Sequence, residues 1–146
     1  AKYKIEAFLK EKQDWIRTHR EKALAAAEQK AANRLTEAER KASVKRAAQM
    51  LAEKTAHFAK EMGVTYGRIT IREQKTRWGS CSSAGNLNYN WKLVLMPERV
   101  MDYVVIHELA HRKEMNHSAR FYAVVAQQMP DYKVWQSWLK EHGREY

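Results

Sequence analysis

The sequence predicts an α+β fold, in which a helical section is followed by short strands and then by further helices. Residues 1–62 contain neither proline nor glycine and are rich in alanine, lysine, glutamate and glutamine, which favours helix. Residues 64–96 contain short segments with strand-like alternation, and helical signals return from Pro97 onward. We therefore expect two parts, a helical N-terminal section over residues 1–62 and a core over residues 63–146.

The helical section is predicted to contain two helices. The first covers residues 1–35, and the pair Thr36 and Glu39 matches a capping box that begins the second. In the second helix the positions that favour burial recur at steps of three and four, and they are Val44, Ala48, Leu51, Thr55, Phe58 and Met62. Gly63 suits the left-handed residue that follows a helix. We expect this stripe to pack against the chain's own core, and a coiled-coil dimer is the alternative.

Three strands are expected next. Residues 68–72 alternate polar and apolar side chains, as a half-buried strand does. Residues 76–83 and 87–96 are the other strand candidates, and the turn-forming quartet Ser83–Asn86 joins them.

Helices complete the predicted core. Pro97 is expected to stop the last strand and to open a helix, because proline suits a first helical turn. Ser118 can cap a further helix that extends to about Gln128, and Asp131 can cap a last helix that ends near Gly143.

The first of these helices contains the motif His107-Glu108-Leu109-Ala110-His111, and His117 follows shortly after it. Two histidines four residues apart lie on the same helix face, about one turn apart, so both imidazoles can hold one zinc ion. His117 can supply a third ligand and leave the fourth position to water, which is the arrangement of catalytic rather than structural zinc sites. The sequence therefore predicts a zinc centre, although nickel or cobalt also suits three histidines.

The carboxylate of Glu108 is not needed as a ligand in this arrangement and is free for proton transfer. We expect it to accept a proton from an attacking water and to return that proton to the leaving group. Zinc would acidify the water and polarise a scissile carbonyl. This predicts a zinc-dependent hydrolase with Glu108 as its catalytic residue.

Composition narrows the class of protein. No apolar run is long enough to span a membrane, and lysines at positions 2, 4, 10 and 12 interrupt any signal-peptide core. The single cysteine, Cys81, excludes an internal disulfide, and we expect a cytoplasmic protein. The net charge is +10, which favours anionic partners such as nucleotides or nucleic acid, although acidic residues interleave with the basic ones almost everywhere.

Residues 64–143 contain several separate blocks that recur in order: Arg77-Trp78-Gly79-Ser80-Cys81, Asn90-Trp91-Lys92-Leu93, Pro97, residues 103–111 around the motif, and Asn116-His117-Ser118 with Phe121. These blocks resemble those of the YgjP-like zinc metallopeptidases, which are related by motif to the SprT-like and WLM proteases. Upstream, Phe8-Leu9 and Trp15-Ile16 look like the family's helix before the core. Members usually begin with additional strands that this chain lacks, as expected either of a shortened chain or of a trimmed member of the family.

The resemblance implies a zincin-like fold, in which a small antiparallel or mixed sheet packs on the motif helix. It also implies zinc bound by His107, His111 and His117, with Glu108 as the catalytic acid and base. By the same analogy, part of residues 87–96 is expected to pair with an extended peptide substrate by strand addition.

Six further residues allow two interpretations each. Trp78 and Trp91 could line a substrate pocket or belong to the core, and Cys81 fits a small buried apolar group better than a fourth ligand. Arg77 could hold an anionic group of the substrate or form a structural ion pair. Asn116 could orient His117 or simply form a turn, and Asn90 is grouped with these residues as a substrate or supporting residue.

The substrate is the open part of the prediction. We expect a metallopeptidase that acts on a peptide or protein. The alternatives are a zinc-dependent phosphohydrolase, in which Arg72, Lys75 and Arg77 would bind a nucleotide or other phosphoanhydride, and a basic nucleic-acid-associated module.

Overall fold

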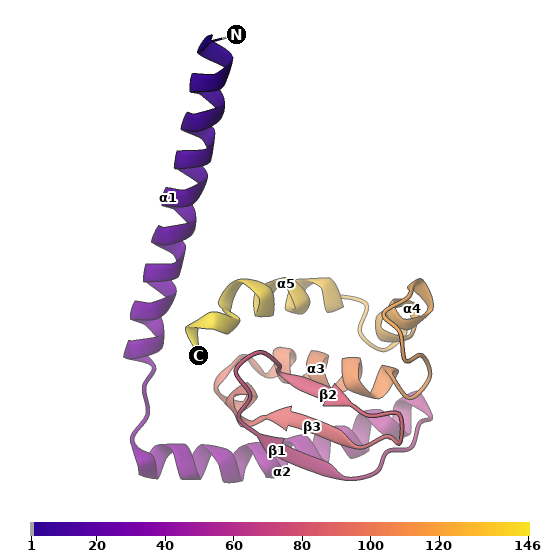
Figure 1. Cartoon of the computed structure of the whole chain (residues 1–146). Helices are drawn as coiled ribbons and strands as arrows, with labels where there is room; N and C mark the ends of the chain where they lie inside the picture. The colour runs from indigo at the N-terminus through magenta and orange to yellow at the C-terminus, as the bar shows by residue number, and fades with distance from the viewer. Residues whose placement is uncertain (1) are drawn as a thin grey trace. The chain divides into compact units, whose positions relative to one another are not determined.

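The computed structural model describes residues 2–146, with side chains from Lys4 onward, as two compact units (Figure 1). One unit comprises the residues up to Arg34 together with Glu141–Tyr146, and the other comprises Leu35–Lys140. The described residues form five α-helices and one mixed three-stranded sheet, which confirms the predicted α+β class. The domain boundary expected between residues 62 and 63 stays a prediction.

The first unit is built on α1 (Lys2–Ala32), the helix expected from the absence of proline and glycine. A hydrogen bond from Nδ2 of Asn33 to the carbonyl oxygen of Glu145 (3.2 Å) joins its end to the short 3-10 helix η2 (Gly143–Glu145). The large apolar side chains along α1 are exposed, and they are Ile5, Phe8, Leu9, Trp15, Ile16 and Leu24.

The second unit begins with α2 (Glu37–Met62), which starts and ends as predicted. Thr36 and Glu39 form the capping box, and Gly63 follows the helix with φ 69°. The predicted buried stripe is correct at three positions and shifted by one residue at the other three, because the buried residues are Ser43, Ala47, Leu51, Thr55, Ala59 and Met62. Small side chains at positions 43, 47 and 59 let neighbouring elements approach closely, whereas Ala48 is exposed and Val44 and Phe58 are half-buried.

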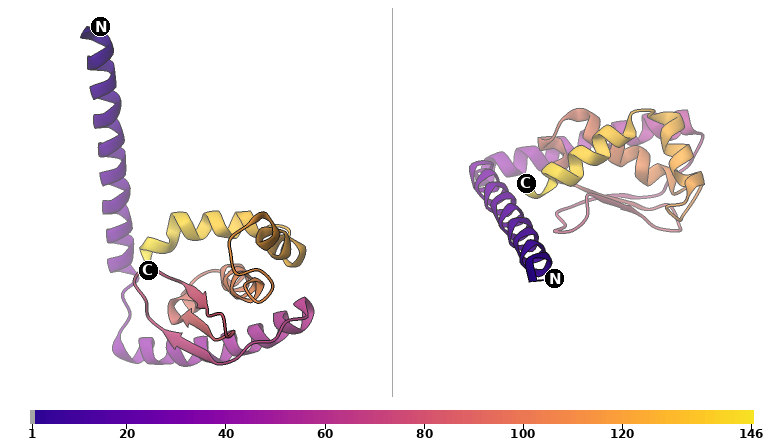
Figure 2. Two further views of the ribbon diagram at one scale, coloured as in Figure 1. Left: turned by 45° about the vertical axis from the view of Figure 1, so that its right-hand side comes forward. Right: turned by 90° about the horizontal axis from the view of Figure 1, so that it is seen from above.

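The sheet has the order β1-β3-β2, where β1 is Ile69–Arg72, β2 is Gly79–Cys81 and β3 is Leu87–Asn90. The central strand β3 pairs in parallel with β1 and antiparallel with β2. The sheet forms an outer layer with α2, α3 and α4 to one side of it, which the right-hand view of Figure 2 shows. The strand-addition site expected within residues 87–96 is therefore wrong, since both edges of β3 are already paired and β2 is an edge strand.

The strand expected over residues 87–96 is also too long, because it stops at Asn90 and the 3-10 helix η1 (Trp91–Leu95) follows. The side chain of Asn90 accepts a hydrogen bond from the backbone N–H of Lys92 (3.0 Å) and so caps this turn. Trp91 and Leu93 are both buried although they lie in a 3-10 helix. Because they are two residues apart, the sequence shows the same alternation as a strand. Similarly, β2 occupies only three of the eight residues expected for it.

Three α-helices follow: α3 (Glu98–Ala110), α4 (Ala119–Gln128) and α5 (Tyr132–His142). Pro97 occupies the N-cap position of α3 rather than its first turn, and the Ser118 hydroxyl caps α4 by accepting from the N–H of Phe121 (3.3 Å). Almost all of α3 is buried, because it lies between α2, the sheet and α4. Among the helices that the structure describes, none combines the length and apolar content needed to cross a membrane.

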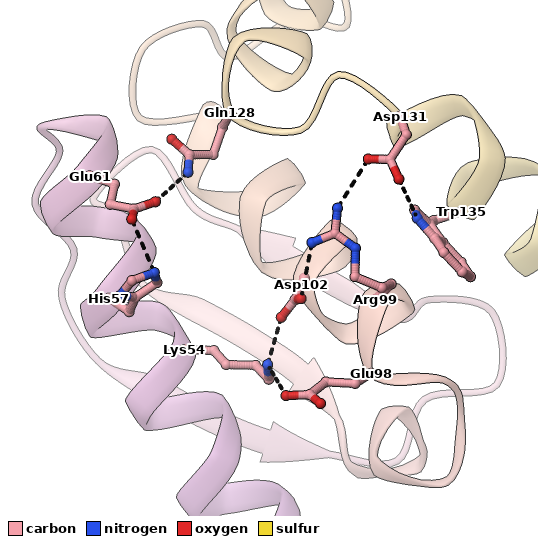
Figure 3. A network of polar contacts seen from close by, with 9 residues as sticks. All are labelled: Lys54, His57, Glu61, Glu98, Arg99, Asp102, Gln128, Asp131 and Trp135. Carbon is pink, nitrogen blue, oxygen red and sulfur yellow. Dashed lines mark hydrogen bonds and ion pairs between the residues drawn. The ribbon is translucent and has the colours of Figure 1, made fainter.

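A network of polar contacts ties α2 to α3 and to the start of α5 (Figure 3). Nζ of Lys54 lies 2.6 Å from Oδ1 of the buried Asp102 and 2.8 Å from Oε1 of Glu98. Arg99 bridges Asp102 (3.5 Å) and Asp131 (3.0 Å), and the Asp131 carboxylate also accepts from the indole N–H of Trp135 (3.2 Å). This network fixes the position of the helix that carries the motif.

Candidate metal centre

The motif lies at the C-terminal end of α3, most of whose residues are buried. His107 and His111 are four residues apart and lie one above the other on the same face of the helix, with ring centroids 5.3 Å apart. His111 is 8% exposed, and the helix ends at this residue. The predicted placement of the two imidazoles on one helix face is thus what the structure contains.

His117 reaches the same point from the segment that connects α3 and α4. Its Nε2 atom lies 3.2 Å from Nε2 of His107 and 3.2 Å from Nε2 of His111. Three ring nitrogens that converge in this way form a set that could hold a metal ion. The N-cap of α4 at Ser118 directly follows His117, so the start of that helix determines where the third imidazole lies.

The other ring nitrogens of two histidines are held by neighbours. Nδ1 of His111 lies 3.2 Å from the carbonyl oxygen of Glu114, which can only accept, so this nitrogen carries the proton and Nε2 keeps its lone pair. Nδ1 of His107 lies 3.3 Å from the hydroxyl of Tyr103, one turn earlier in α3. Such contacts orient metal-binding imidazoles and set their tautomer.

Phe121 packs against all three imidazoles. Its ring is stacked on His111 with centroids 4.5 Å apart, and it meets His107 and His117 edge to face at 4.8 and 4.9 Å. The side chain is completely buried. Phe121 therefore forms a buried apolar surface against which all three imidazoles pack.

Glu108 lies beside the cluster, on the side of the sheet. Its Oε1 atom is 3.9 Å from Nε2 of both His107 and His111, and the residue is 4% exposed. Burial raises the pKa of Glu108 to about 7, and the charge of Arg77 acts in the opposite direction. A carboxyl group with this pKa can both accept and release a proton near neutral pH.

Burial acts on the histidines in the opposite sense. It lowers the pKa of His107 to about 4, with further lowering from the neighbouring charges of His111 and His117. Burial also lowers the pKa of His111. Both imidazoles are therefore neutral at pH 7, which is the form in which histidine binds a metal.

The supporting residues expected from sequence lie in different places. Asn90 is buried, and its Nδ2 donates to the carbonyl oxygens of Gln74 (3.0 Å) and Arg77 (3.4 Å), so it anchors the segment before β2. The side chain of Arg77 is exposed. Trp78 is half-buried, and its carbonyl oxygen accepts from the backbone N–H of Asn90 (2.9 Å).

The remaining expected residues lie outside the cluster of imidazoles. Trp91 belongs to the core, because its buried indole donates to Oε1 of Glu73 (2.9 Å) and packs under the guanidinium of Arg40. Asn116 is exposed, and its carbonyl oxygen accepts from the N–H of Ser118 (2.8 Å) as in a turn. Cys81 is half-buried rather than fully buried.

Three features of the centre were assigned no role from the sequence. The Tyr103 hydroxyl could have been found, because tyrosine four residues before a histidine lies on the same helix face. The ring of Phe121 and the contact of Gly79 with Glu108 have no local signal. A Cβ atom at position 79 would lie 3.1 Å from Cγ of Glu108, so glycine is what allows β2 to lie this close to α3.

The model of the YgjP-like metallopeptidase domain matches residues 27–142, which is most of the chain. The chain belongs to the YgjP-like metallopeptidase family. This membership confirms the resemblance of the sequence blocks, and it implies a metal ion, for which the three histidines are the available ligands.

Two solved structures have the same fold as this YgjP-like chain. The metallopeptidase zymogen abylysin of Pyrococcus abyssi is 24% identical with a TM-score of 0.56, over 61% of this chain and 90% of that chain. The metallopeptidase zymogen jannalysin of Methanocaldococcus jannaschii is 19% identical with a TM-score of 0.50, over 57% of this chain and 90% of that chain. At these identities they establish the zincin-like fold alone. No curated protein matches the chain.

Proposed function

We propose that this protein is a zinc-dependent metallopeptidase in which His107, His111 and His117 hold the metal and Glu108 is the catalytic base and acid. The observation that carries the proposal is the convergence of three Nε2 atoms, two of them 3.2 Å from the third, with a buried carboxylate oxygen 3.9 Å from two of them. Three imidazoles are a ligand set that suits zinc and leaves room for water.

The residues around the cluster fit a bound metal. The contacts of Nδ1 in His107 and His111 leave their Nε2 atoms directed toward His117, and no carboxylate or cysteine is needed to complete the set. Zinc held there would act as a Lewis acid toward the scissile carbonyl and would acidify a water. Phe121 excludes solvent from below the cluster, which strengthens electrostatic interactions within it.

Glu108 supplies proton transfer in this proposal. With its pKa raised to about 7 by burial, the carboxylate accepts a proton from the attacking water and returns it to the amine that leaves. A fully exposed glutamate would be too weak a base for this role, because its pKa lies near 4.3. Burial of Glu108 in α3 therefore brings the pKa of its carboxyl group into the range that proton transfer near neutral pH requires.

The substrate is proposed to lie along the free edge of β2. The carbonyl oxygen of Trp78 and the N–H of Ser82 both bond with the segment of β3. Because antiparallel pairing alternates, the peptide groups of Gly79 and Cys81 point away from β3 and are available to an added strand. Gly79 is also close to Glu108, since a Cβ atom at position 79 would lie 3.1 Å from its Cγ, so a peptide bound here passes beside the proposed base.

The experiment combines metal analysis with an activity screen. The purified protein should contain close to one zinc per chain and should hydrolyse casein-derived peptides. Glu108→Gln should retain the metal and lose about 10²–10⁴-fold of the activity. Glu141→Gln, which makes the same chemical change at an exposed position, is the control and should keep both properties.

Two results would contradict the proposal. The first is full peptide hydrolysis by Glu108→Gln. The second is release of phosphate from nucleoside triphosphates, lost in Glu108→Gln, without cleavage of any peptide; this outcome would establish the phosphohydrolase alternative instead.

A further inference from the structure

The sheet segment has an excess of basic over acidic residues. Residues 64–92 contain five lysines and arginines and a single acidic residue, Glu73. That carboxylate is already engaged, since its Oε1 accepts from the Trp91 indole (2.9 Å) and lies 3.8 Å from Arg40. An anionic ligand at this end of the sheet would therefore meet no competing acidic side chain from the same segment.

Arg77 combines an anchored backbone with an unoccupied side chain. Its carbonyl oxygen accepts from Nδ2 of the buried Asn90, and the next residue, Trp78, is paired with β3 through the N–H of Asn90. The guanidinium is exposed, and within the described part of the chain no carboxylate lies within 4.0 Å of it. Arginine held in this way is positioned for a ligand rather than for a structural ion pair.

The position of Arg77 relates it to the reaction. It precedes Gly79 by two residues, a span of at most about 7 Å, and a Cβ atom at position 79 would lie 3.1 Å from Cγ of Glu108. The guanidinium is thus near the free edge of β2 and near the proposed base.

The opposite end of β2 is also positive. Arg112 directly follows His111, and it donates from Nε to the carbonyl oxygen of Thr65 (2.8 Å) and from Nη1 to that of Ser83 (3.3 Å). Carbonyl oxygens satisfy its donors without neutralising its charge. A peptide along the edge of β2 therefore has a positive charge near each end of the contact.

We propose that Arg77 is a specificity-determining residue that binds a carboxylate of the substrate, so that this enzyme prefers peptides with an aspartate or glutamate within two or three residues of the scissile bond. The inference rests on the proposed peptidase function. The planar guanidinium matches a carboxylate in a two-point hydrogen-bonded pair, which lysine cannot form. Because the pair is exposed, we expect a preference of about tenfold rather than of several orders of magnitude.

The test uses peptides that differ at one position only. Starting from a peptide that the enzyme cleaves, glutamate, glutamine or lysine is placed in turn at each of the three positions on either side of the scissile bond. At one position or more, kcat/KM for the glutamate peptide should exceed that for the glutamine peptide by about tenfold at low salt. The ratio should shrink as ionic strength rises, because salt screens exposed charges.

Variants assign the preference to one side chain. In Arg77→Gln the glutamate-to-glutamine ratio should fall to about one, in Arg77→Glu it should invert in favour of lysine, and Arg77→Lys should restore part of it. Arg46→Glu makes the same charge change at an exposed position of α2 and should leave the ratio unchanged. Melting temperatures establish that each variant is folded.

The outcomes separate the two proposals. Cleavage of the glutamate, glutamine and lysine peptides at equal rates by the parent would overturn the specificity of Arg77 and leave the peptidase intact. An equal loss for all three peptides in Arg77→Gln would also overturn it, because the residue would then act on the reaction. If the parent cleaves no peptide, the peptidase proposal fails. The affinities of labelled glutamate and glutamine peptides for the parent and for Arg77→Gln, measured by fluorescence anisotropy, then decide whether Arg77 binds the carboxylate.

Discussion

The missing side chain of Gly79 makes room for Glu108: a Cβ atom at position 79 would lie 3.1 Å from Cγ of the glutamate. The same atom would lie 3.1 Å from a methyl group of Val104 and 3.2 Å from the carbonyl oxygen of Asn88. The edge strand β2 therefore lies so close to the motif helix α3 that there is no room for a side chain at position 79. The distance between the proposed base and the proposed substrate strand depends on this glycine.

Replacing this glycine should impair the enzyme without removing the metal. In Gly79→Ala the added methyl group has contacts on three sides, one of them backbone, so β2 must move away from α3. We expect kcat/KM for peptides to fall at least about tenfold, because misplacement by about 1 Å costs up to 10²-fold. Ser80→Ala, which changes the opposite face of the same strand, is the control. Unchanged kinetics in Gly79→Ala would disprove the close approach.

The hydroxyl of Tyr103 should contribute to metal affinity. Tyr103→Phe removes the group that lies 3.3 Å from Nδ1 of His107, so the imidazole loses its orienting contact. Changes of this kind weaken metal binding by about 10–100-fold. The measurement is competition for zinc with a chelator of known affinity. Tyr122→Phe, which alters a half-buried tyrosine whose ring stacks on Tyr132, should bind zinc like the parent.

Ionisation of Glu108 should destabilise the metal-free protein. The pKa is about 7 in the folded state against an ordinary value of 4.5, so the folded state binds more protons between these two values and loses stability as pH rises through that range. Glu108→Gln does not titrate there. In the presence of chelator, its free energy of unfolding should therefore exceed that of the parent by more at pH 8 than at pH 4.5. The change is on the order of 3 kcal/mol. A difference that is the same at both pH values would contradict the assigned pKa.

The ion pair between Lys54 and the buried Asp102 should contribute strongly to the free energy of unfolding. Lys54→Met leaves the buried carboxylate of Asp102 with only the more distant Arg99, at 3.5 Å. An uncompensated buried charge costs about 3–5 kcal/mol, so we expect a loss of this size in the free energy of unfolding by urea. Lys60→Met, at an exposed position of the same helix, provides the comparison. The double variant Lys54→Met with Asp102→Leu should recover much of the loss, and no recovery would show that the lysine acts through packing instead.

The parts of the fold that the sequence predicts are those with local chemical signals. The capping box at Thr36, the left-handed Gly63, the Ser118 cap and the helical spacing of His107 and His111 each depend on residues within one turn of each other. The capping signals are strong because they satisfy backbone groups that would otherwise lack partners, whereas the spacing of the two histidines follows from the period of the helix. They placed the helices of the core correctly and put His107 and His111 on one helix face, where their imidazoles meet that of His117.

The parts that were mispredicted depend on contacts between distant segments. The strand expected through Met96 ends at Asn90, because the side chain of that residue caps a 3-10 turn and also bonds to the segment before β2. The buried face of α2 follows its small residues, since those allow the closest packing, and not the larger Val44 and Phe58. Which strand is left at the edge of the sheet depends on pairing order, which no local pattern specifies.

Phe121 has a consequence for how the metal centre forms. Because one aromatic ring touches all three imidazoles and lies in the first turn of α4, ordering of the ligands and docking of that helix are the same event. Metal binding should then slow the exchange of backbone amide hydrogens throughout α4, and chelation should speed it, while the amides of α2 respond much less. We therefore expect α4 to be docked on the centre while the metal is bound and to become more mobile when the metal leaves.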